Sequence, residues 1–321
     1  MYAFRASARH RLLLSTPSAG LGIALTTQIT ALSWLLESQY NLAIDDIALV
    51  WAAGPLAGIL GQVAAGHASD RSWLLGGRRR AYLLMSGIFS SAALLALPEL
   101  DTVAAALGGI SIVLVAACVA LLLDIAINVG LNPARALIAD IVPPGPERSL
   151  TFAYMQTLSG ATGVAITIVG AWLGNMWMIL VAAILALPLT SIPGFLVREP
   201  REIAAPELAE KLSLKLLMAM LLPIAPAAAF AVISSAAKVM GSTIPVIPLA
   251  LATAVATALL AIPIFRTNRT DQVALARRIL FAQGLSWIGI FSMFVFLAPV
   301  AAERLPHLDQ DQVGRDIAWS L

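Results

Sequence analysis

Charged side chains are scarce in this chain of 321 residues, where Asp, Glu, Lys and Arg together make up 12%. A soluble domain carries about 25%. Hydrophobic residues make up 60% of the chain, and its mean hydropathy is +0.88. No soluble core could hide this much apolar surface, so lipid must be the solvent for most of the chain. The composition therefore excludes an ordinary soluble domain and predicts an all-α polytopic membrane protein.

Cysteine and the usual enzyme motifs are also nearly absent. The single cysteine, Cys118, lies in an apolar run and cannot form an internal disulfide, so we expect it to pack as a small hydrophobic residue. The chain has no His-Glu-x-x-His, no phosphate-binding glycine loop and no nucleophile elbow. We therefore predict that the protein is not an enzyme and uses no cofactor and no metal.

Long apolar runs dominate what is present. Nine of them reach the length of about 20 residues that a helix needs to cross the hydrocarbon core. The fourth run is too long for a perpendicular span, so it must tilt or extend beyond the bilayer as helix. The nine runs are residues 14–36, 47–67, 81–98, 105–138, 151–173, 177–197, 214–236, 243–265 and 279–299.

The 20 Lys and Arg residues indicate how these spans are oriented. If the N-terminus is inside, 17 of them fall on inner loops or inner helix ends, and only Lys238, Arg304 and Arg315 fall outside. Positive residues are retained on the cytoplasmic side of a membrane. We therefore expect an integral protein of a bacterial inner membrane with a cytoplasmic N-terminus. Topology accounts for the arginines, so we expect no nucleic-acid partner.

The loop after the second span contains a cluster of charged residues in an otherwise apolar chain. It contains Asp70 and four arginines, together with two glycines that topology does not explain. Resistance to crossing the membrane explains the arginines but not Asp70. The residues of interest in this loop are Gly66, Asp70, Arg71, Gly77, Arg78, Arg79 and Arg80.

The fourth span carries a polar face. Asp124, Asn128, Asn132 and Arg135 lie within about 80° of arc on a helix. An acidic residue in a span costs about 2.5–3.5 kcal/mol on insertion scales, so it usually faces a cavity or a partner. Desolvation disfavours the charged form of such a carboxyl, whereas a nearby Arg135 would favour it. Asp124 is therefore either a proton carrier or one partner in a structural ion pair or hydrogen bond between helices.

Two of these motifs resemble one known family. Gly66-His-Ala-Ser-Asp70-Arg71, followed by Gly77-Arg78-Arg79-Arg80, resembles the loop between the second and third helices of the major facilitator superfamily. Residues 53–58 and 123–140 resemble, more narrowly, sucrose transporters and the glycoside–pentoside–hexuronide:cation symporters. The resemblance covers residues 15–200 and returns weakly at Ser286-Trp287.

The resemblance implies roles for these residues. Asp124 would couple transport to protons and Arg135 would sense its charge, while the loop would latch the two halves of a carrier in its outward-facing state. A substrate cavity would include Asn128, Asn132, Gln156 and Trp287. The chain departs from the family at Val63 and Ala81, where proline is usual, and at His67, where an aromatic is usual.

The resemblance also implies a division of the chain. Residues 1–200 would form an N-terminal six-helix transporter half, and residues 201–266 a cytoplasmic linker with an inserted helix pair. Residues 267–321 would supply the first helix of an incomplete C-terminal half. Because such carriers work by rocking two halves around a central site, we expect a partial chain or a second chain that supplies the missing helices.

These observations predict a proton-coupled symporter for a glycoside, a sugar or a related small polar solute that works by alternating access. Its partners would be membrane lipid, the solute and the proton. The alternative is a membrane assembly or pigment-delivery factor on the same scaffold that does not transport. Solute flux would favour the first function, and stable association with a larger membrane complex would favour the second.

Overall fold

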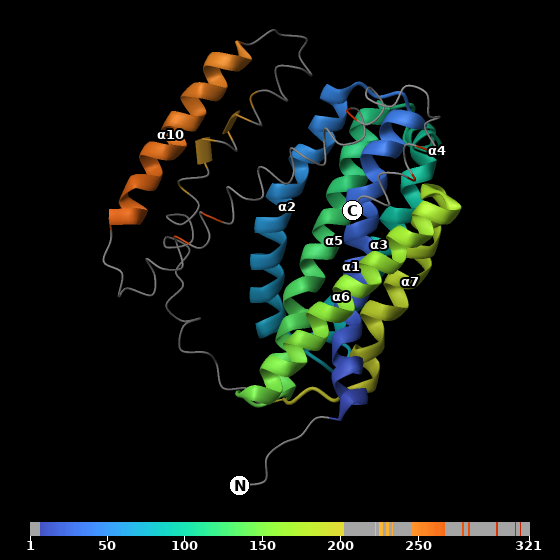
Figure 1. Cartoon of the computed structure of the whole chain (residues 1–321), viewed down its shortest axis with the longest axis vertical. Coiled ribbons are helices and arrows are strands. Elements are labelled where there is room, and N and C mark those ends of the chain that lie inside the picture. The colour runs from blue at the N-terminus through green and yellow to red at the C-terminus, as the bar shows by residue number, and fades with distance from the viewer. Residues whose placement is uncertain are drawn as a thin grey trace. The chain divides into compact units, whose positions relative to one another are not determined.

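The computed structural model describes residues 7–201 and 245–266, together with a few isolated positions (Figure 1). The chain divides into two compact units. The first contains all of residues 7–201 and the second contains residues 245–266. Apart from an isolated bridge between Leu74 and Gly77, the regular structure in the described residues is helical.

The first unit is built from long helices joined by short loops. They are α1 (Ala8–Ser38), α2 (Ile44–Arg71), α3 (Arg80–Ala96), η1 (Leu97–Glu99), α4 (Leu100–Ala106), α5 (Ile112–Ile141), α6 (Pro146–Leu173) and α7 (Asn175–Leu196). The second unit contributes α10 (Val246–Arg266). The first six predicted spans correspond to α1, α2, α3, α5, α6 and α7, and the eighth corresponds to α10. The seventh and ninth predicted spans lie outside the described residues.

The helices have the length and composition of membrane spans. Five stretches qualify within the described residues: α1, the α3–α4 segment, α5, α6 and α7. The 28 residues of α2 also give a helix about 42 Å long, more than the hydrocarbon core requires. The predicted all-α polytopic membrane fold is confirmed.

The predicted start of the fourth span is wrong. Residues 105–107 end α4 and its turn instead, and α5 begins only at Ile112. Gly108 and Gly109 separate the two helices with φ values of +90° and +79°, which few residues other than glycine adopt readily. Composition does not reveal this break, because the residues on both sides of it are apolar. The span continues as helix to Ile141, beyond its predicted end at residue 138.

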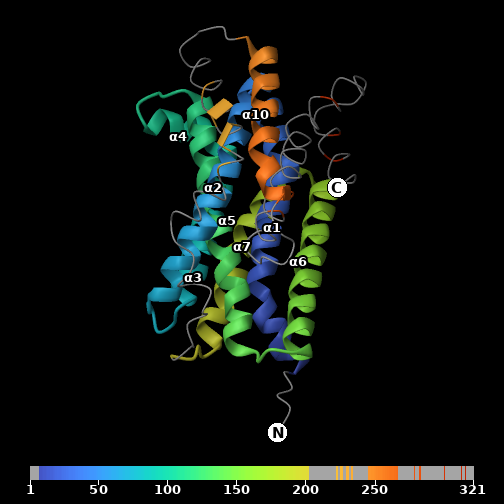
Figure 2. The same ribbon diagram turned by 90° about the vertical axis from the view of Figure 1, so that its left-hand side faces the viewer.

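The core of the first unit forms around α1, which is buried along most of its length (Figures 1 and 2). It packs mainly against α6 and α7, while α3 packs against α5 and α7. The second helix packs mainly against α5. Asp124 and its neighbours on α5 therefore lie among α1, α2 and α3.

Small residues allow these helices to approach closely, as is usual inside membranes. A Cβ atom on Gly61 of α2 would lie 3.4 Å from the Asn128 Cβ on α5. One on Gly20 of α1 would lie 2.9 Å from the Ala186 carbonyl oxygen on α7. At Gly61, α2 therefore lies close against the polar side of α5.

Candidate functional site

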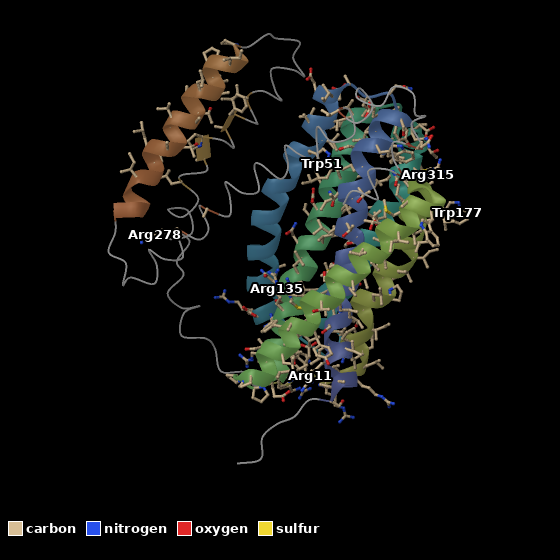
Figure 3. The ribbon with its side chains drawn as sticks, in the orientation of Figure 1. Arg11, Trp51, Arg135, Trp177, Arg278 and Arg315 are labelled. Carbon is tan, nitrogen blue, oxygen red and sulfur yellow. The ribbon has the colours of Figure 1, made fainter. Side chains whose placement is uncertain are left out.

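The arginines of residues 7–201 gather toward one end of the bundle, called here the arginine end. This end is formed by the starts of α1, α3 and α6 and the ends of α2, α5 and α7. Figure 3 shows Arg11 and Arg135 in this half and Trp51 in the other. The opposite end carries acidic residues, among them Asp45, Asp46, Glu99 and Asp101.

Arg79 ties three helices together at the arginine end. Its Nη1 lies 2.6 Å from Asp70 Oδ1 at the end of α2, and its Nε lies 2.9 Å from Asp140 Oδ2 at the end of α5. Nη1 also donates to Ser69 Oγ, 2.6 Å away. The Arg79 side chain is 5% exposed, whereas Asp140 is 10% and Asp70 53% exposed. Arg79 thus reaches acidic residues on two neighbouring helices.

These carboxylates keep Arg79 charged although it is buried. Burial acts to lower the pKa of the guanidinium. The hydrogen bonds and charges of Asp140 and Asp70 outweigh burial and raise that pKa above its usual value. The cluster forms an ionic clamp between α2, α3 and α5, and its arginine stays charged at every physiological pH.

A second clamp joins the same loop to α7. Glu199, just after α7, accepts hydrogen bonds from the backbone N–H groups of Arg78 (2.7 Å), Arg79 (2.9 Å) and Arg80 (3.2 Å). These are the unpaired donors at the start of α3, where a carboxylate also complements the helix dipole. Gly77 leaves room for this carboxylate, which a Cβ atom at that position would overlap.

Glu199 was not predicted from the sequence, although the start of α3 indicates that an acceptor is needed there. Arg79 occupies the N-cap position of α3 and provides no side-chain cap, and the first turn contains no acidic residue. A helix that starts without Ser, Thr, Asp or Asn at the N-cap needs an acceptor from elsewhere. The first acidic residue after the sixth span is Glu199.

A recess of about 370 Å³ opens beside the ionic clamp. It brings the predicted loop residues Gly66, Asp70 and Arg79 together with Asn132 and Arg135 from the polar face of α5. Arg135 is exposed there. The recess is completed by Ala136, Ala139 and Phe152.

The rest of the polar face does not reach this recess. Asp124 lies in the middle of α5, 7% exposed, beside the side chain of Gln28 on α1. Asn128 donates through Nδ2 to the Asp124 backbone carbonyl at 2.8 Å, not to its carboxyl group. Arg135 lies eleven residues further, about 16 Å along the helix axis. Within the described part of the chain, Asp124 forms no ion pair.

The remaining predicted residues are scattered. Arg71 is exposed at the end of α2, and Arg78 and Arg80 lie in the loop and at the start of α3. Gln156 is exposed on α6 and does not line the recess. Trp287 lies outside the described residues.

Several polar side chains in the middle of the bundle are buried without a hydrogen-bond partner. Both amide atoms of Gln28 on α1 and the hydroxyls of Ser86 and Ser90 on α3 belong to this set. These three residues are at most 1% exposed. Buried polar groups normally have partners, because desolvating them otherwise costs free energy. Such buried donors and acceptors provide sites where a water or a proton can bind.

The family comparison covers nearly the whole chain. The family model described as Major Facilitator Superfamily matches residues 18–313. The chain belongs to the major facilitator superfamily. Its members are membrane transporters, and the loop between α2 and α3 carries one of the two motifs that resemble the family.

Two curated relatives are similar to part of this major facilitator. The sucrose transport protein SUC4 of Arabidopsis thaliana is 29% identical over 175 residues, which cover 50% of this chain and 34% of the relative. The general alpha-glucoside permease of Schizosaccharomyces pombe is 30% identical over 136 residues, 37% of this chain and 25% of the relative. The matches thus span between a quarter and a third of these relatives. No solved structure matches the chain.

Proposed function

We propose that this chain is part of a proton-coupled carrier for a glycoside or a related small polar solute, and that Asp124 takes up and releases the coupling proton. The observation that carries the proposal is the position of Asp124: it is buried in the middle of a membrane-spanning helix and forms no ion pair within the described residues.

The surroundings of Asp124 suit a carboxyl group that changes its charge. A permanently charged carboxylate in a span would be paired, since an unpaired buried charge is costly. The Gln28 side chain lies beside it, and the Gln28 amide has no other hydrogen-bond partner in the described structure. An amide can donate to a carboxylate or accept from a carboxylic acid, so Gln28 can serve either protonation state.

The arginine end suits a gate. The ionic clamp holds α2, α3 and α5 together, and the helix that carries Asp140 at its end carries Asp124 in its middle. Asn128 and Asn132 lie between the two along α5. In this arrangement Arg135 belongs with Asn132 to the recess beside the clamp, and it is too far from Asp124 for a direct contact.

The class of solute is inferred from the relatives. One is named for sucrose and the other for alpha-glucosides. Hydroxyl-rich solutes need donors and acceptors such as those of Gln28, Ser86 and Ser90. We therefore propose a glycoside, with the asparagines of α5 and Gln156 as further hydrogen-bonding residues.

The test uses the complete protein that contains this chain, in proteoliposomes with radiolabelled sucrose or maltose. Asp124→Asn should abolish accumulation driven by an inward proton gradient while retaining exchange of labelled for unlabelled solute. Asp101→Asn, at the opposite end, is the matched control and should behave as wild type. Unchanged proton-driven accumulation in Asp124→Asn would contradict the role of Asp124.

The same measurement separates carrier from assembly factor. A wild-type protein that shows no flux of any glycoside, and that is recovered only within a larger membrane complex, would refute the carrier. In that case Asp124→Asn should alter complex formation and not transport.

A further inference from the structure

Exposed apolar side chains gather on two neighbouring segments at the arginine end. On the loop between α2 and α3, Trp73 is 36%, Leu74 50% and Leu75 60% exposed. On the last turn of α7, Phe195 is 57% and Leu196 67% exposed. These five side chains and the arginines beside them, Arg71, Arg78, Arg80, Arg198 and Arg201, are called the interfacial patch.

Specific contacts join the two segments into one surface. Arg78 donates through Nη2 to the Arg201 carbonyl oxygen at 2.9 Å. The Arg201 guanidinium lies 5.8 Å from the centre of the Trp73 ring, and the Arg80 guanidinium lies 5.8 Å from that of Phe195. The backbone hydrogen bonds to Glu199 fix the loop against the same part of the chain. The patch is therefore preorganised.

The loop presents its apolar tip at a conformational cost. Leu74 and Gly77 form a bridge, and the two residues between them have positive φ values, +54° at Leu75 and +78° at Gly76. Such a tight turn normally places Asn or Gly at the first of these positions. A leucine with positive φ is rare, and here it directs a bulky apolar side chain away from the protein.

The charge around this apolar tip is predominantly positive. Five arginines lie in the patch, and the two neighbouring carboxylates, Asp70 and Glu199, are already engaged by Arg79 and by the start of α3. The apolar side chains continue from the exposed end of a membrane-spanning helix. The patch thus combines exposed apolar groups at the end of a membrane-spanning helix with guanidinium groups that match phosphate oxygens.

We propose that the interfacial patch binds anionic phospholipid in the leaflet on the arginine side of the membrane. Leu74, Leu75 and Phe195 would lie among the upper acyl chains, and Arg78, Arg80 and Arg201 would bind the phosphates. A negative surface attracts each such arginine, and the attraction falls with added salt. This inference concerns the membrane contact and is independent of the transported solute.

The first experiment measures the depth of the loop tip. In a Cys118→Ser background, Leu75→Cys is labelled with an environment-sensitive nitrobenzoxadiazole dye, and the protein is placed in nanodiscs of phosphatidylglycerol and phosphatidylcholine. The control is Pro143→Cys, in the exposed loop between α5 and α6 at the same end. The label at position 75 should emit at shorter wavelength and be quenched several-fold more by brominated lipid than the label at 143. Equal quenching at the two positions would overturn the proposal.

The second experiment measures lipid selectivity. Native mass spectrometry of the purified protein should show phosphatidylglycerol retained several-fold more than phosphatidylcholine. Arg201→Gln should reduce that ratio markedly, whereas Arg9→Gln, which removes an exposed arginine outside the patch, should leave it nearly unchanged. Equal retention of both lipids by wild type would overturn the proposal. If the label at position 75 is shielded only when another protein is added, the patch binds a protein partner, and the proposal is likewise overturned.

Discussion

The ion pairs of the described residues lie at the arginine end of the bundle, whereas several buried polar side chains in its middle have no partner. At the arginine end, Arg79 meets two carboxylates, Glu199 accepts from three backbone N–H groups, and Arg11 of α1 lies 2.6 Å from Glu147 of α6. In the middle, the hydroxyls of Ser86 and Ser90 are fully buried and have no hydrogen-bond partner in the described structure.

The difference separates structural polar groups from functional ones. A group whose hydrogen bonds are all made inside the protein stabilises one arrangement of the helices. A buried group without a partner retains the capacity to bind something else, at a cost to stability. We therefore expect the arginine end to control stability and helix arrangement, and the middle to control solute and proton binding.

The largest effect on stability should come from opening the ionic clamp. Arg79→Gln leaves the carboxylate of Asp140, which is 10% exposed, buried without its cation. Breaking a buried pair in this way costs about 3–5 kcal/mol. The free energy of unfolding, measured by titration with sodium dodecyl sulfate in dodecyl maltoside micelles, should fall by about that amount.

The two acidic partners of Arg79 provide the control. Asp140→Asn should also be strongly destabilising, whereas Asp70→Asn should cost about 1 kcal/mol or less, because Asp70 is 53% exposed and water replaces the lost interaction. Similar losses for the two substitutions would mean that burial does not set the strength of this clamp.

The next effect should come from the close packing of α5 against α3 in the middle of the bundle. A Cβ atom on Gly130 would overlap Ser86 Oγ and lie 2.9 Å from Leu21 Cδ2 of α1. Gly130→Ala should therefore lower the free energy of unfolding by about 2–3 kcal/mol, as other overpacked cores do. The same detergent titration measures it.

Ser86→Ala tests whether this contact is responsible. It removes the closest atom, so the double variant with Gly130→Ala should recover part of the loss, and the two changes should not be additive. Additive losses would place the strain elsewhere in the helix interface.

A smaller and more local effect should come from Glu199. Glu199→Ala removes the acceptor for three N–H groups at the start of α3, and losing an N-cap acceptor costs about 0.5–2 kcal/mol. Hydrogen exchange should become faster at Arg80 and in the loop before it. Glu199→Gln keeps one acceptor oxygen, so its exchange rates should lie between those of Glu199→Ala and wild type. Unchanged exchange in Glu199→Ala would show that water caps α3 equally well.

The sequence was sufficient for most of the fold because each span is a long apolar run. It failed at the start of α5, because residues 105–107 are as apolar as a span but Gly108 and Gly109 turn the chain there. Composition records how much apolar surface is present, whereas this boundary depends on two backbone conformations.

The site was only half predictable. Periodicity placed Asp124, Asn128, Asn132 and Arg135 on one face of a helix. In the structure, Asp124 lies against α1, Asn128 lies against α2, and Asn132 and Arg135 line the open recess. The acidic partners of the loop were harder to predict. Asp140 and Glu199 come from distant segments of the chain, and tertiary packing decides which arginine each of them binds. Local sequence indicates a charged loop but not that Arg79 is its buried member.

The smallest effect separates the two regions most directly, because it uses two serines that are both fully buried. Ser69 at the arginine end accepts from Arg79 and donates to the Gly66 carbonyl oxygen, whereas the Ser90 hydroxyl in the middle has no partner. Ser69→Ala should cost about 1 kcal/mol or somewhat more, because it removes a hydrogen bond to a charged group. Ser90→Ala should change the free energy of unfolding by roughly 0.5 kcal/mol or less, since it removes a desolvated hydroxyl and no bond. If Ser90→Ala lowers the free energy of unfolding as much as Ser69→Ala does, the Ser90 hydroxyl must be hydrogen-bonded to a bound water or solute in the resting protein. Transport would then have to displace that water or solute.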